Sequence, residues 1–161
     1  MTALAPSIVV IGIGNEYRSD DGVGIAVARR LRERFFAKIT VLEESGEGAA
    51  LMNSWTGATW VMLVDAVHSG ASPGTIHRLD AHAEQVPADF FNYSTHAFGL
   101  AEAIGLARSL NELPPHLIVY GIEGENFSAG KGLSVAVEQA VETVVERAAG
   151  ELREAMSNSD D

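Results

Sequence analysis

Residues 7–12, SIVVIG, and the glycine-rich segment GIGNEYRSDDGVG at residues 12–24 give the clearest indication of the fold. A short run of β-branched residues that ends in glycine is typical of a strand buried in a parallel sheet. After the turn, apolar residues recur at four-residue steps, at Val23, Val27, Leu31 and Phe35. This spacing predicts an amphipathic helix over about residues 21–34. A buried strand that turns directly into a helix is the opening unit expected of an α/β fold.

The rest of the chain continues the alternation of strands and helices. Further strands are predicted at residues 39–42, 60–65, 75–79 and 117–121, and further helices at residues 49–55, 95–110 and 134–156. The loop at residues 67–74 is too short for a parallel crossover, so the strand at 75–79 should run antiparallel to its neighbour. We therefore expect a three-layer αβα sandwich with a mixed, mostly parallel five-stranded sheet. Residues 1–156 should form a single domain and residues 157–161 a disordered tail.

The composition is that of an acidic globular domain. The 161 residues include 11 Lys and Arg against 22 Asp and Glu, for a net charge of −11, and 47% of them are hydrophobic. Such a chain repels a polyanion, so nucleic acid is not an expected partner. The sequence contains no cysteine, which excludes thiol catalysis, iron–sulfur clusters and cysteine-ligated zinc. A metal would have to be bound by carboxylate, imidazole, carbonyl or water.

No targeting signal is evident at the start of the chain. Residues 1–6 lack the positive charges of a signal peptide, and the apolar run at residues 7–13 is far shorter than a membrane span. We therefore expect a cytoplasmic protein with no membrane partner.

Three polar segments should meet at the sheet edge where open α/β folds bind their ligands. They are the acidic loop at residues 12–24, Asp65 with the residues that follow it, and residues 94–99, which contain His96. The positive end of the helix predicted there disfavours imidazolium, so His96 should stay neutral, as a metal ligand must. Two carboxylates and a neutral imidazole in one crevice would form an O,O,N site for a borderline divalent metal.

Each of these residues also has a purely structural interpretation. Asp20 and Asp21 could cap the following helix, and Asp65 could bind backbone amides in the next loop. His96 could simply pack beside Phe98 at the start of its helix. The residue types alone leave both interpretations open.

Two segments of the chain resemble nucleotide-binding motifs, but each lacks a residue that the motif requires. A dinucleotide-binding loop needs a third glycine where this chain has Tyr17, and the acidic residues of the loop would repel a pyrophosphate. The segment at residues 124–132 imitates a phosphate loop, but it has five residues between its glycines instead of four. In addition, Gly132 stands where Ser or Thr is required. These departures argue against a nucleotide-binding role.

The order of the polar motifs resembles that of the hydrogenase maturation proteases. The motifs are Gly12-x-Gly-Asn15, Asp20-Asp21-Gly22-x-Gly24, Asp65-Ala66, His96 with Gly99-Leu100, and Gly132-Leu-Ser134 before the last helix. The resemblance spans about residues 7–152. It implies an endopeptidase that trims a C-terminal extension from the precursor of a nickel–iron hydrogenase large subunit after nickel insertion.

The resemblance also implies the site residues. Carried over by motif, Asp21, Asp65 and His96 are the catalytic residues and contact the metal, which is nickel carried by the precursor and not a permanently held cofactor. Some members have Glu at the position of Asp21, so the side chain that contacts the metal is one methylene shorter here. Some members carry Asp-Gly-Gly near Glu44, whereas this chain reads Glu-Ser-Gly. We expect that difference to affect substrate preference more than the reaction.

Two other functional classes are compatible with the same residues. A non-catalytic nickel-binding chaperone would bind the precursor without releasing a peptide, so a cleavage assay distinguishes it from a protease. A nucleotide-binding enzyme would be revealed by a thermal-shift screen with nucleotides.

Overall fold

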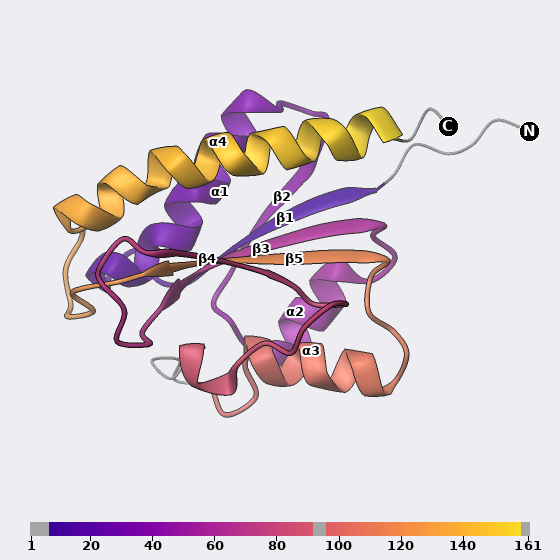
Figure 1. Ribbon diagram of the computed structural model, residues 1–161, viewed down its shortest axis with the longest axis horizontal. Coiled ribbons are helices and arrows are strands. Elements are labelled where there is room, and N and C mark those ends of the chain that lie inside the picture. Colours follow the sequence, from indigo (N-terminus) through magenta and orange to yellow (C-terminus); the bar gives the residue numbers. More distant parts are fainter. Residues whose placement is uncertain (1–6, 92–95, 159–161) are drawn as a thin grey trace, which may run out of the picture.

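The computed structural model describes residues 7–91 and 96–158, which are built around one five-stranded sheet (Figure 1). The strands lie in the order β2-β1-β3-β5-β4. They are β1 Ile8–Ile13, β2 Thr40–Glu44, β3 Trp60–Val67, β4 Ile76–Asp80 and β5 His116–Glu123. The helices are α1 Val23–Arg34, α2 Gly48–Trp55, α3 Leu100–Ser109 and α4 Val135–Ser157, with short 3-10 helices η1 Ser19–Gly22 and η2 Ala88–Phe91.

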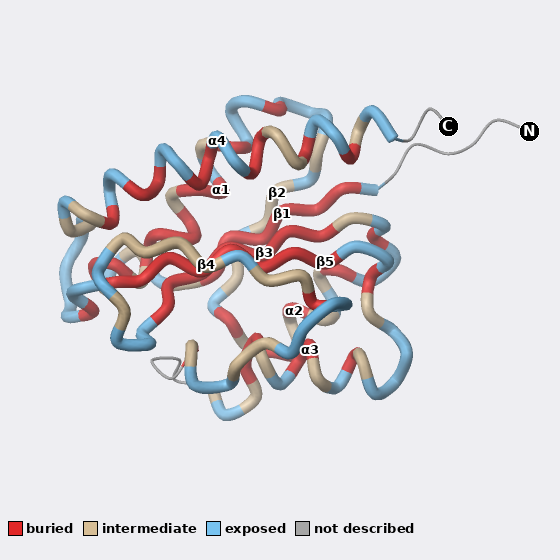
Figure 2. The backbone as a smooth tube through the Cα atoms, in the orientation of Figure 1, coloured by how far each residue is buried: buried red, intermediate tan, exposed pale blue. Residues whose placement is uncertain are grey.

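The three central strands, β1, β3 and β5, are buried along almost their whole length (Figure 2). Every residue of β1 is buried, and in β3 and β5 only the first residue is not. A strand covered by helices on both faces has no solvent side. It is therefore a nearly continuous apolar run and does not alternate between apolar and polar residues.

Helices α1 and α4 cover one face of the sheet, and α2 and α3 cover the other (Figure 1). Successive residues of β1 supply the two apolar cores because strand side chains point to alternate faces. Val10 belongs to the core that contains Leu31 of α1, whereas Ile11 belongs to the core that contains Leu51 of α2. The predicted three-layer α/β architecture is confirmed.

The predicted direction of β4 is also confirmed, since it pairs antiparallel with β5. Two predicted boundaries are wrong. The helix predicted at residues 95–110 begins at Leu100, where the Gly99 amide donates to the Glu102 carboxylate at 2.9 Å, and residue 95 lies outside the described residues. The predicted tail begins too early, because α4 continues through Ser157, and residues 159–161 lie outside the described range.

The longest helix, α4, has 23 residues and is apolar on one face only. Val137, Val141 and Val144 are buried in the core, whereas Glu138 and Glu142 are exposed. Within residues 7–91 and 96–158, no helix has the length and apolar character needed to cross a membrane.

Candidate active site

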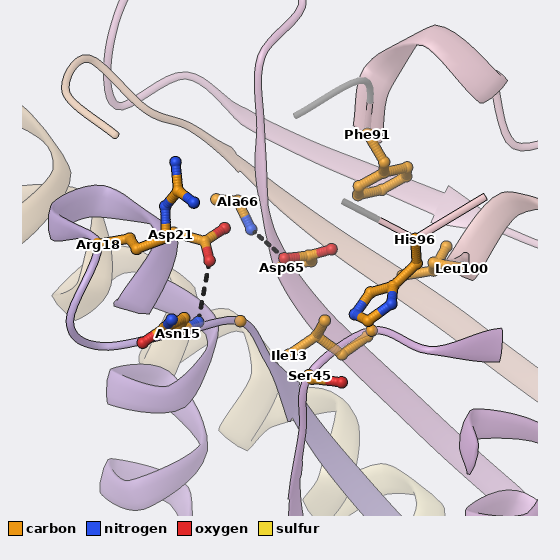
Figure 3. Close-up of a pocket in the computed structure, with 12 residues that line it drawn as sticks. Ile13, Asn15, Arg18, Asp21, Ser45, Asp65, Ala66, Phe91, His96 and Leu100 are labelled. Atoms are coloured by element: carbon orange, nitrogen blue, oxygen red, sulfur yellow. Dashed lines mark hydrogen bonds between the residues drawn. The ribbon is translucent and has the colours of Figure 1, made fainter. Parts of the chain in front are cut away.

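A partly open cavity of about 280 Å³ lies at the carboxyl ends of β1 and β3 (Figure 3). The chain leaves β1 for β2 on one side and returns to β3 on the other, so the strand order reverses here, as it does at ligand sites of open α/β sheets. The polar side chains among its described lining residues are Asn15, Arg18, Asp21, Ser45, Asp65 and His96. Three chain segments that are far apart in sequence therefore bring Asp21, Asp65 and His96 to one cavity.

Asp65 lies near the end of β3 and is only 9% exposed. Its Oδ1 accepts a hydrogen bond from the Ala66 amide at 2.8 Å, so its backbone partner is the next residue of the strand and not a loop amide. Burial, and next the negative charge of Asp21, raise the pKa of Asp65 well above its ordinary value, against the opposing effect of the Ala66 hydrogen bond. The Asp65 carboxylate is therefore a stronger base than that of an exposed aspartate.

Asp21 lies in η1 and is half-buried at the cavity. Its Oδ2 accepts the Asn15 amide at 2.9 Å. Burial raises the pKa of Asp21, while the Asn15 hydrogen bond and the positive charge of Arg18 oppose that rise. The loop closes onto Asp21 because residue 14 is glycine. Its φ is +137°, and a Cβ at this position would lie 1.9 Å from the Asp21 carbonyl oxygen.

His96 lies four residues before α3, in a segment that packs on the start of α2. The Gly48 amide donates to the Phe98 carbonyl at 2.8 Å, and a Cβ on Gly48 would lie only 2.3 Å from the Phe98 ring. The expectation that His96 opens the helix is wrong, because α3 begins at Leu100. The helix dipole therefore acts on this ring less directly than the sequence suggested.

The three predicted residues line the same cavity, but their side chains are too far apart to coordinate one metal ion together. In Figure 3, Asp65 lies between Asp21 on one side and His96 on the other. Over the described part of the chain, no three His, Asp or Glu side chains lie close enough together to hold a metal ion by themselves. A metal ion bound in this cavity would need additional ligands from another molecule.

Asp20 does not cap the following helix, contrary to the capping interpretation. The N-cap of α1 is Gly22, without a side-chain hydrogen bond, and Asp20 is completely buried. Its carboxylate accepts the amides of Glu125 at 2.8 Å, Asn126 at 2.9 Å and Ser134 at 2.7 Å, together with the Ser134 hydroxyl. Burial alone would raise the pKa of Asp20, but these hydrogen bonds together lower it. Asp20 thus joins the first loop to the loop before α4.

The same contacts explain the incomplete phosphate-loop motif at residues 124–132. Backbone amides of this loop do bind an anion, as those of a phosphate loop do, but the anion is the Asp20 carboxylate of the same chain. The segment therefore has a structural role, although its sequence resembles a nucleotide-binding motif.

A G-x-S-x-G spacing, the spacing of a serine-hydrolase nucleophile turn, occurs at residues 70–74. It lies in the loop between β3 and the antiparallel strand β4, whereas a nucleophile elbow requires a turn from a strand into a helix. Ser72 does not line the cavity.

Sequence reasoning missed Arg18, which lines the cavity beside Asp21. It stands in the acidic loop, where the carboxylates dominate the pattern and the surrounding motif contains no other basic residue. The isolated parallel bridge between Arg18 and Gly130 could not be found from local sequence, because it joins positions 112 residues apart.

Comparison with known proteins identifies the family. A profile described as hydrogenase maturation protease matches residues 25–151. The hydrogenase 2 maturation protease of Escherichia coli is 30% identical, over 91% of each chain. The hydrogenase expression/formation protein HoxM of Cupriavidus necator is 29% identical, over 91% of this chain and 74% of its own. The solved structure of the hydrogenase maturating endopeptidase HybD from Escherichia coli matches with a TM-score of 0.80 at 28% identity, over 92% of this chain and 93% of that one. The chain therefore belongs to the hydrogenase maturation protease family and is an endopeptidase.

Proposed function

We propose that this protein removes a C-terminal extension from the precursor of a nickel–iron hydrogenase large subunit after nickel has been inserted. The observation that carries the proposal is the meeting of Asp21, Asp65 and His96 in one partly open cavity. The relatives are maturation proteases, which supports a protease and not a chaperone or a nucleotide-binding enzyme.

We also propose that these three side chains contact the nickel of the substrate. Two carboxylates and an imidazole fit a borderline divalent ion. Their spread around the cavity fits an ion that arrives with ligands of its own. Because the sequence contains no cysteine, it offers nickel only the harder ligands. It can therefore contact the ion without withdrawing it from a partner that holds it more tightly.

Contact with the bound nickel would orient the peptide to be cut. Orientation of a reacting bond can contribute several kcal/mol to catalysis. A carboxylate of the same cavity would act as the general base that removes a proton from the attacking water. Asp21, Asp65 and His96 together would hold the ion and keep the scissile bond in place.

Purified protein incubated with nickel-loaded and nickel-free precursor tests the proposal, with cleavage followed by mass spectrometry. We expect a peptide to be released from the nickel-loaded precursor only. Binding of that precursor without release of a peptide would favour the chaperone instead. Equal cleavage of both forms would show that nickel is not recognised.

Substitution of His96 by alanine tests the assignment of the site. Processing should be abolished while the melting temperature stays close to that of the wild type, since His96 lies in a loop segment outside the central strands. His116→Ala is the matched control because His116 is exposed at the start of β5, at the opposite end of the sheet, and stacks on Trp60. Processing that survives in His96→Ala would rule out its proposed contact with nickel.

We further propose that the protein acts in the cytoplasm, because the hydrogenase precursor is synthesised there and would be processed there. Fractionation of cells that express both proteins, with detection of the released peptide in each fraction, tests this location.

A further inference from the structure

Arg18 brings a positive charge into a cavity whose proposed catalytic residues are two carboxylates and an imidazole. The side chain is half-buried and lines the same space as Asp21, Asp65 and His96. In Figure 3 it lies beside Asp21, on the side of the cavity opposite His96. Among the described lining residues, Arg18 is the only lysine or arginine.

The backbone holds Arg18 in place independently of its side chain. Its amide donates to the Asn15 carbonyl at 3.1 Å, and its carbonyl accepts the Asp21 amide at 3.1 Å. On either side of it, the Ser19 amide donates to the Gly130 carbonyl and the Gly130 amide donates to the Tyr17 carbonyl, both at 2.8 Å. The loop before α4 therefore fixes this position. A change confined to the side chain should leave the wall of the cavity intact.

Peptide hydrolysis benefits from a permanently charged hydrogen-bond donor, which none of the other three proposed residues provides. When water attacks a carbonyl carbon, negative charge develops on the carbonyl oxygen, and a fixed donor aimed at that oxygen lowers the barrier. Ionised carboxylates accept hydrogen bonds and cannot donate them. A guanidinium is permanently charged and presents several N–H groups in a rigid plane.

We propose that Arg18 binds the carbonyl oxygen of the scissile peptide bond and stabilises the negative charge that forms on it during hydrolysis. This role rests on the proposed function, because it assigns one more group to the same reaction. It also explains why a cation lies next to Asp21 in a site that is otherwise acidic.

The step balances with groups already present in the cavity and with water. The water oxygen bonds to the carbonyl carbon, and the electron pair of the C=O π bond moves onto the carbonyl oxygen beside Arg18. A cavity carboxylate takes the proton of the water and passes it to the amide nitrogen. The C–N bond then breaks as the C=O bond reforms, which releases a carboxylic acid and an amine.

The kinetic signature of this role is a loss of kcat with little change in KM, because the interaction is made in the transition state. We expect Arg18→Gln to lower kcat for the nickel-loaded precursor by about 100–1000-fold, the usual cost of removing one oxyanion donor. Arg18→Lys should lose less, because it keeps the charge but not the planar fork. Arg30→Gln is the matched control, since Arg30 lies on α1 outside the cavity and pairs with Glu142.

Chemical rescue separates this role from a structural one. Guanidinium chloride at a non-denaturing concentration should restore part of the kcat of Arg18→Ala and have no such effect on His96→Ala. An unchanged kcat in Arg18→Gln, or a rise in KM alone, would overturn the role of Arg18. If Arg18→Gln does not fold, Arg18→Lys must still show a lower kcat at unchanged KM. Failure of the wild-type protein to cleave competent nickel-loaded precursor would instead overturn the proposed function, and this role with it.

Discussion

Substitution of Asp20 by asparagine tests how the first loop is held in position. The Asp20 side chain is completely buried and accepts hydrogen bonds from three backbone amides and one hydroxyl, all in the segment 125–134. Asparagine has nearly the same shape, but it replaces one acceptor oxygen by an NH₂ group. It also removes the negative charge that strengthens the remaining bonds.

The geometry sets the size of the effect. Oδ2 accepts the amides of Glu125 and Asn126 and the hydroxyl of Ser134, whereas Oδ1 accepts only the Ser134 amide. The amide oxygen of asparagine should therefore take the place of Oδ2, which leaves its NH₂ facing the Ser134 N–H. A buried donor left without an acceptor costs roughly 1–3 kcal/mol. With weaker bonds at the other oxygen, we expect a loss of about 2–4 kcal/mol in the free energy of unfolding.

Urea unfolding at pH 7, followed by circular dichroism, measures this loss. A protein of this size should lose about 4–16 °C in melting temperature for that change. Asp89→Asn is the matched control, because Asp89 is exposed in η2 and its replacement should change stability by no more than about 0.5 kcal/mol. If Asp20→Asn is as stable as this control, Asp20 does not hold the two loops together.

Two further substitutions test other supports of the site. Gly14→Ala should destabilise the protein by about 1–3 kcal/mol and slow precursor cleavage, because its φ is positive and the new Cβ would strike the Asp21 carbonyl oxygen. A melting temperature and a cleavage rate equal to those of the wild type would refute that reasoning. Glu123 is buried and accepts the amide and hydroxyl of Ser69. Burial alone would raise the pKa of Glu123, but its hydrogen bonds, including that to His77, lower it. The carboxylate therefore contributes stability above its ordinary pKa of 4.5, and this stability is lost as pH falls through the lowered value. Glu123→Gln should cost about 1–3 kcal/mol at pH 7 and less at pH 3 in urea unfolding. An equal cost at both pH values would contradict the prediction.

The layers of the fold and the kinds of reactive group available can be predicted from the amino-acid sequence alone. The apolar run at residues 7–12 had to be buried on both faces, since it offers no polar side to water. The length of the loop at residues 67–74 required an antiparallel β4, because a chain this short cannot cross the sheet. Both features depend on local composition and chain length, which can be read directly from the residues. The resemblance that named Asp21, Asp65 and His96 depended on local motifs in order.

The role of each charged residue of the first loop, in contrast, depends on contacts that form only in the folded protein. Asp20 and Asp21 are neighbours of the same type, yet Asp20 is bound by the loop before α4 and Asp21 lines the cavity. In a 3-10 turn, successive side chains diverge by about 120°, so adjacent residues face different surroundings. Those surroundings come from the segments at residues 96 and 125–134, which lie far away in the chain. The role of each aspartate was therefore fixed only when folding brought the segments together, and the same holds for Arg18.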